Sequence, residues 1–365
     1  MILIILGIPT TLLVILGTGV SLIVLLLLLG VVYQRIGGVL DRKRLLAPGR
    51  LVEIGDGRRL YVVEKGPVGR GPSVVFESGF AATSINWAHI QEAVAEQVHT
   101  VSYDRCGMGW SSAAISDRTP TQIAAELQSM LRAAGVPPPY VLVGHSFGGL
   151  IVQRFALDYP GETASVLLLD PMRTDEWPPV NAARHATVAR AQRLTGHGVH
   201  LARFGMARLA ARSHLCRSAK LSGFLVRLAG SQGKFLEQRL NTEIGKMPPH
   251  VRPAIAAHWS TPRFYHGLLA HLSAVHATVA EMHETEPIRD VPVVVLTPGS
   301  ATPIEDMRKF GPMSREIIAE RSRHWVHLDD PELVIRTILE MVLQNGSWEQ
   351  HGDRSVADLT AADWP

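Results

Sequence analysis

The sequence predicts an α/β fold with a mostly parallel sheet, one long helical insertion and an apolar N-terminal helix. Three observations predict it. Apolar strand-like runs alternate with helical runs over residues 51–170, the same alternation returns over 287–345, and a glycine-flanked serine turn follows one of the apolar runs. Alternation of this kind favours parallel strands, because each connecting helix covers one face of the sheet.

The first half of the chain supplies most of the expected sheet. A Gly-Asp-Gly turn at 55–57 between two short apolar runs predicts a β-hairpin. The strands expected in this half are, in order, residues 51–54, 59–64, 73–77, 99–104, 141–143 and 164–169. The helices expected between them are residues 86–97, 121–134 and 149–158.

Residues 171–286 interrupt the alternation, since they are helical in composition and contain no clear strand. We expect them to form a helical lid inserted into a core made of 51–170 and 287–345. Two more strands, near 291–297 and 316–320, complete an eight-stranded sheet, and a helix over 331–344 closes the core. The polar, acidic tail 346–365 is expected to be mobile.

The turn Gly144-His-Ser-Phe-Gly148 carries the first sign of chemistry. In the Gly-x-Ser-x-Gly nucleophile elbow, a strained strand-to-helix turn exposes the serine hydroxyl. Gly144 and Gly148 are needed there because a Cβ at either position would collide where the helix doubles back on the strand. Ser146 is therefore the candidate nucleophile, and it needs a base to take its proton during attack.

Three further motifs accompany the elbow in order: Phe76-Glu-Ser-Gly-Phe80, Tyr103-Asp-Arg-Cys-Gly-Met-Gly-Trp-Ser111 and His324-Trp-Val-His-Leu-Asp-Asp-Pro-Glu332. With these motifs, the chain from about residue 50 to 345 resembles the α/β-hydrolase superfamily, specifically the bacterial serine hydrolases that carry an N-terminal membrane helix. The resemblance implies a Ser-His-acid triad that acts through an acyl-enzyme without a cofactor.

Aligned on the family pattern, His324 takes the place of the catalytic base, and His327 becomes a lid or packing residue. The acid is an open choice. Most of the family places it after the penultimate strand, where this chain offers only Glu305 and Asp306. Some relatives place it after the strand that follows the elbow, where Asp170 ends an apolar run. We favour Asp170, with a simple turn or cap aspartate as the competing interpretation.

The resemblance also implies an oxyanion hole made of the backbone N–H groups of Phe80 and Phe147. No metal site is expected, because the scattered lid histidines lack a ligand spacing such as His-Glu-x-x-His. Cys106 lies beside the site in sequence, and a packed thiol is the favoured interpretation.

Residues 1–34 carry no charged side chain, and about 20 such residues suffice to cross a bilayer. We expect a transmembrane anchor here and not a cleaved signal peptide, because no basic residue precedes the apolar run and no clear cleavage site follows it. Residues 35–50 form a basic linker. The positive-inside rule then predicts a single-pass protein with its catalytic domain in the cytoplasm.

A net charge of +3 is too small to indicate nucleic acid binding. The two cysteines imply no disulfide framework. Residues 201–212 are expected to form one basic amphipathic helix with Arg203, Arg208 and Arg212. Such a helix would let the lid lean on the lipid bilayer; a solvated basic face is the alternative.

These features predict a membrane-anchored serine hydrolase that cleaves carboxylic esters, with a lipophilic substrate as one option. C–C bond hydrolysis, acyl transfer and perhydrolysis use the same triad and stay open, as does a non-catalytic binding protein that kept the fold. The elbow serine argues against epoxide hydrolase and dehalogenase chemistry, for which this fold uses an aspartate. The sequence leaves the substrate-binding residues unknown.

Overall fold

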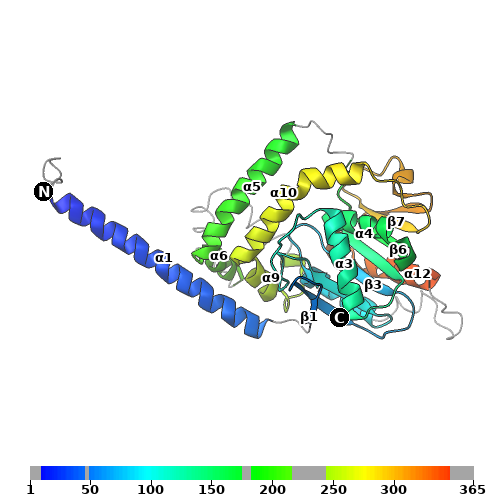
Figure 1. The fold of residues 1–365 in the computed structure, drawn as a ribbon, viewed down its shortest axis with the longest axis horizontal. Coiled ribbons are helices and arrows are strands. Elements are labelled where there is room, and N and C mark those ends of the chain that lie inside the picture. Colours follow the sequence, from blue (N-terminus) through cyan, green and yellow to red (C-terminus); the bar gives the residue numbers. More distant parts are fainter. Residues whose placement is uncertain (1–9, 46–48, 175–181, 216–243, 346–365) are drawn as a thin grey trace.

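The computed structural model describes residues 10–45, 49–174, 182–215 and 244–345. Its centre is one eight-stranded sheet with the order β1-β2-β4-β3-β5-β6-β7-β8, which confirms the predicted fold class (Figure 1). The strands are β1 (Arg50–Glu53), β2 (Arg59–Lys65), β3 (Ser73–Glu77), β4 (Thr100–Asp104), β5 (Tyr140–His145), β6 (Thr163–Leu169), β7 (Val293–Pro298) and β8 (Ser314–Ala319).

The direction of the strands changes near one edge of the sheet. β1 pairs with β2, and β2 with β4, in antiparallel fashion. Every later pair, from β4·β3 to β7·β8, is parallel. The carboxyl ends of β3, β5, β6, β7 and β8 therefore meet at one edge of the sheet, and this edge is where sites form in such folds.

The sheet is covered on both faces by helices. These core helices are α2 (Ala88–Ala95), α3 (Pro120–Ala134), α4 (Phe147–Asp158), α11 (Val326–Asp329) and α12 (Pro331–Asn345). Alternate residues of β5 serve the two faces: Leu142 packs in the cluster with α3 and α4, whereas Val141 and Val143 pack in the cluster with α2 and α12. This period of two explains the apolar run before the elbow, since both sides of the strand are buried.

The described residues of the lid region contain the helices α5 (Ala182–Arg203), α6 (Met206–Leu215), α9 (Arg252–Trp259) and α10 (Pro262–His283). α5 and α10 lie side by side beyond the carboxyl edge of the sheet (Figure 1). The expectation of one basic helix over 201–212 is wrong. The chain breaks between α5 and α6 at Gly205, which has φ +74°, and Arg208 is buried instead of facing outward.

Helix α1 (Thr10–Arg44) is long and continuous. Its 35 residues extend for about 50 Å at 1.5 Å per residue, and its apolar part is long enough to cross a membrane. The helix continues beyond residue 34, so most of the expected linker is helical. It projects from the body at its N-terminal end, while its C-terminal part lies against the lid helices (Figure 1). The tail 346–365 lies outside the described residues.

Candidate active site

Ser146 occupies a strained turn between β5 and α4. Its φ of +53° and ψ of −118° lie in a region that non-glycine residues rarely adopt. A Cβ on Gly144 would lie 2.7 Å from the Gly148 carbonyl oxygen, and one on Gly148 would lie 2.6 Å from the carbonyl oxygens of Glu77 and Ser78. These close approaches give the physical reason for both glycines, because backbone atoms cannot move aside as flexible side chains can.

The elbow is joined to the end of β6 by backbone hydrogen bonds. The N–H of Ser146 donates to the Leu169 oxygen at 3.0 Å, and the N–H of Met172 donates to the Ser146 oxygen at 3.1 Å. Asp170 lies between these two contacts, with φ +41° and its own N–H bonded to the Leu296 oxygen at 3.0 Å. The carboxylate of Asp170 is thus carried on a turn that is fixed to both β5 and β7.

His324 lies in the loop between β8 and α11, and its Nδ1 is 2.7 Å from Oδ2 of Asp170. Because the carboxylate accepts, Nδ1 carries the proton of this bond and Nε2 is left as the basic nitrogen. About half of the His324 side chain is exposed, 49%, so the imidazole remains accessible from outside.

The two alternative carboxylates are placed differently. Asp306 caps the short helix Met307–Phe310 by accepting from the N–H of Arg308, and it also pairs with the Arg308 side chain at 2.8 Å. These hydrogen bonds lower the pKa of Asp306. Glu305 is exposed. Of the three candidate acids, Asp170 is the one that contacts His324.

Two buried histidines lie behind His324. Nε2 of His145 donates to the backbone oxygen of His324 at 2.8 Å, and the His327 ring packs against both His145 and Trp87. Burial lowers the pKa of His327 to about 3 and that of His145 well below its usual value, with further lowering by neighbouring histidines. Both rings are therefore neutral near pH 7. His327 is a packing residue, as expected.

The two residues expected to form the oxyanion hole lie next to each other. The rings of Phe80 and Phe147 meet edge to face, with centroids 4.8 Å apart. Phe147 is the first residue of α4, and the first N–H groups of a helix have no partner within it. The positive end of the helix dipole adds to this, so the N-terminus of α4 suits a developing negative charge.

Arg105 fixes the loop that carries Phe80. Its guanidinium is buried, donates to the carbonyl oxygens of Ser78 and Gly79 at 2.7 and 2.6 Å, and pairs with buried Glu77 at 2.9 Å. In a planar trans peptide the C=O and the following N–H point in opposite directions. Since the Gly79 oxygen faces Arg105, the N–H of Phe80 faces away from it.

His271 of α10 completes the surroundings of the two phenylalanines. Its ring is fully buried, with centroids 5.9 Å from Phe80 and 5.8 Å from Phe147. Nδ1 lies 2.8 Å from the Gly267 oxygen, so Nδ1 carries the proton and Nε2 presents a lone pair. Within the described residues, Nε2 has no hydrogen-bond partner. The sequence showed His271 only as one of several lid histidines, because nothing local reveals which part of the lid covers the elbow.

Among the described residues, no cluster of three or more His, Cys, Asp and Glu side chains could hold a metal ion. Cys106 is buried in the core beside α3, and burial raises the pKa of its thiol to about 11. A thiol with so high a pKa is a poor nucleophile. The packed interpretation of Cys106 is therefore confirmed.

Comparisons with known proteins point to one fold family. A family model described as "alpha/beta hydrolase fold" matches residues 72–331. The Bacillus subtilis protein YqjL, named as uncharacterized, is 35% identical over 105 residues, which are 29% of this chain and 42% of that protein. RutD of Escherichia coli, provisionally named a carbamate hydrolase, is 35% identical over 117 residues, 32% of this chain and 42% of RutD.

The chain spans only about two fifths of the length of these relatives. Among solved structures, a variant of a Pseudomonas aeruginosa protein provisionally described as an epoxide hydrolase matches with a TM-score of 0.59. It is 20% identical, and the match covers 82% of this chain and 97% of that one. A likeness at this identity concerns the fold.

Proposed function

The chain belongs to the α/β-hydrolase fold family, and from this premise we propose that it is a serine hydrolase that cleaves carboxylic esters through an acyl-enzyme on Ser146. The observation that carries the proposal is the 2.7 Å contact between His324 Nδ1 and Asp170. It holds the imidazole in the tautomer whose Nε2 can accept a proton, which is the role of the acid in a Ser-His-Asp triad.

In the proposed reaction, the Ser146 hydroxyl attacks the ester carbonyl while His324 Nε2 takes its proton. The tetrahedral intermediate collapses, His324 returns the proton to the leaving alcohol, and the acyl group stays on Ser146. Water then attacks the acyl-enzyme with His324 again as the base, which releases the acid. Asp170 stabilises the imidazolium in both steps.

The N–H groups of Phe80 and Phe147 are the proposed donors to the oxyanion. Support comes from the position of Phe147 at the N-terminus of α4 and from the orientation that Arg105 gives to the Gly79–Phe80 peptide. Removal of one such donor typically costs about 10²–10³ in rate. The serine at the elbow separates this chain from epoxide hydrolase chemistry, for which this fold uses an aspartate nucleophile.

A fluorophosphonate probe tests the proposal directly. The wild-type protein and Ser116→Ala, a control serine outside the elbow, should be labelled, whereas Ser146→Ala should not. No labelling of the wild type would contradict the proposed enzyme and favour a non-catalytic binding protein, whereas equal labelling of Ser146→Ala would contradict Ser146 as the nucleophile. A panel of esters, carbamates and epoxides then separates the substrate classes that the relatives' names suggest.

We also propose that α1 anchors the protein in a membrane with the catalytic domain in the cytoplasm. Support comes from the length and hydropathy of α1 and from the basic side chains that follow its apolar part, including Arg42, Lys43 and Arg44 in its last turn. A reporter fused after Pro365 tests the orientation: activity found only outside the membrane would contradict it.

A further inference from the structure

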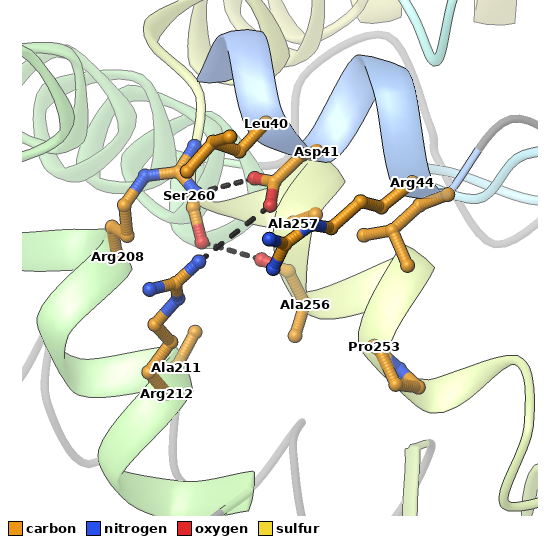
Figure 2. A pocket seen from close by; sticks show the side chains of 11 residues that line it. Leu40, Asp41, Arg44, Arg208, Ala211, Arg212, Pro253, Ala256, Ala257 and Ser260 are labelled. Atoms are coloured by element: carbon orange, nitrogen blue, oxygen red, sulfur yellow. Dashed lines mark hydrogen bonds and ion pairs between the residues drawn. The ribbon is translucent and has the colours of Figure 1, made fainter. Parts of the chain in front are cut away.

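We propose that a pocket between α1 and the lid binds the phosphate of an anionic phospholipid. The pocket has a volume of about 190 Å³ and lies where the last turns of α1 meet α6 and α9 (Figure 2). It is lined by Leu40, Asp41, Arg44, Leu45, Arg208, Ala211, Arg212, Pro253, Ala256, Ala257 and Ser260. The lining contains none of the proposed catalytic residues.

The charge of the lining favours an anion. Three arginines face one carboxylate, which leaves an excess of two positive charges in the lining. Figure 2 shows the guanidinium groups of Arg208 and Arg212 pointing toward Asp41, to which both are paired, Arg212 at 3.7 Å. Guanidinium groups bind phosphate oxygens in a geometry that matches their planar fork of donors.

Arg208 supplies a donor that none of the described residues uses. Its Nε donates to Gln34 at 2.9 Å and its Nη1 to Asp41, which fixes the orientation of the group. The side chain is only 1% exposed, and Nη2 has no hydrogen-bond partner within the described part of the chain. A buried charged donor without a partner is costly, so an incoming phosphate oxygen would be stabilising here.

Apart from Ser260, the remaining lining is apolar and suits the glycerol and upper acyl region of a lipid. Leu40 belongs to the last turns of α1 and Leu45 directly follows the helix, while Pro253, Ala256 and Ala257 belong to α9. Free phosphate would leave this surface without a partner. Because the pocket combines fixed guanidinium groups with apolar side chains, it favours a phospholipid over free phosphate.

The depth of the pocket along α1 agrees with this ligand. Arg35 is the first charged residue after the apolar part of the helix. Leu40 follows five residues later, about 7–8 Å along the axis at 1.5 Å per residue. The headgroup layer of a bilayer is about 5–8 Å thick on each side. If Arg35 marks the edge of the hydrocarbon, the pocket lies at the level of the lipid phosphates.

The site rests on the proposed insertion of α1 in a membrane, and its test uses the full-length protein in nanodiscs and in detergent. Native mass spectrometry should detect retained phosphatidylglycerol in preference to phosphatidylcholine of the same acyl chains. Arg44→Gln with Arg212→Gln should weaken phosphatidylglycerol binding about tenfold or more, because two charge-assisted contacts are lost. The matched control, Arg190→Gln with Arg193→Gln in α5, removes the same charge from exposed positions outside the pocket.

Equal retention of the two lipids would overturn the proposal, as would equal weakening by the pocket and control variants. Displacement of the lipid by millimolar inorganic phosphate would assign the pocket to free phosphate instead and would also overturn it. Reconstitution into nanodiscs tests the membrane insertion of α1 separately from lipid binding. Protein that fails to enter nanodiscs contradicts the insertion of α1, whereas inserted protein that retains no lipid contradicts the pocket.

Discussion

At the scale of single residues, the proposed chemistry depends on a contact between side chains that are 154 positions apart in the sequence. Asp170 lies at the carboxyl edge of the sheet, and His324 reaches it from the loop after β8. Asp306 is nearer to the position that most of the family uses, but it is paired with Arg308 and exposed. This local pairing supports the proposed choice of Asp170 over Asp306 as the acid.

The contact between Asp170 and His324 predicts how substitution of each candidate acid changes kcat. Asp170→Asn should lower kcat by roughly 10³–10⁴, because an amide that donates to Nδ1 would favour the wrong tautomer of His324. Asp306→Asn should leave kcat within about twofold, as expected of an exposed substitution. Ester hydrolysis by the two purified variants checks this, and a larger loss in Asp306→Asn than in Asp170→Asn would reverse the assignment.

The burial of His327 predicts how the free energy of unfolding depends on pH. Its pKa is about 3 in the folded protein and near 6.5 when unfolded, so between these values only the unfolded chain binds the proton. The free energy of unfolding should therefore fall as pH drops below about 6.5, by up to about 1.4 kcal/mol per pH unit for this residue. His327→Phe should remove that part of the slope without breaking a hydrogen bond, since neither ring nitrogen has a partner within the described residues.

Urea unfolding of the wild type and His327→Phe at pH 7.5, 6 and 5 measures the difference between the two slopes. The buried histidines His258 and His271 lie outside the contacts of His327, so they contribute equally to both proteins and cancel. Parallel pH dependences in the two proteins would show that His327 is charged, or accessible to protons, in the folded state.

At the scale of elements, the elbow depends on the close approach of α4 to the end of β3. Gly148 lies in that contact, and an added Cβ would meet two backbone oxygens at 2.6 Å. Gly161, in the short helix Pro160–Glu162, has nothing within 4 Å of an added Cβ. Because Gly148 is crowded and Gly161 is not, Gly161→Ala can serve as the control for Gly148→Ala.

Gly148→Ala should lower the free energy of unfolding by roughly 1–3 kcal/mol, since backbone atoms must shift to admit the methyl group. Gly161→Ala should be neutral or slightly stabilising, because alanine restricts the unfolded chain. Chemical denaturation of both variants measures the change. A Gly148→Ala protein as stable as the wild type would mean that the strand-to-helix turn relaxes easily.

At the scale of the whole molecule, α1 has two parts with different surroundings. The large apolar side chains from Leu12 to Leu29, except Leu13, are exposed. From Gly30 onward the helix meets the lid: a Cβ on Gly30 would collide with the backbone oxygen of Phe204, and one on Gly37 would lie 2.7 Å from Nε of Arg208. The second part therefore belongs structurally to the lid, although it is continuous with the first.

Two truncations separate these roles. Removal of residues 1–29 should release the protein from membranes and leave its Tm nearly unchanged, since the described residues removed make few contacts with the body. Removal of 1–45 should also lower Tm, by roughly 5 °C, because Arg208 loses both Gln34 and Asp41. Thermal unfolding of the two proteins tests this, and identical Tm values would contradict a structural role for the end of α1.

The sequence by itself determined the alternating elements, the elbow at Ser146 and the apolar length of α1. These features are local: periods of two and 3.6 residues report burial, and the glycines report backbone positions that admit no Cβ. Only the tertiary structure decided that Asp170 and not Asp306 meets His324, that His271 covers Phe80 and Phe147, and that Arg208 is buried against α1. Each of these depends on long-range packing of the lid and of strands distant in sequence, which no local pattern encodes.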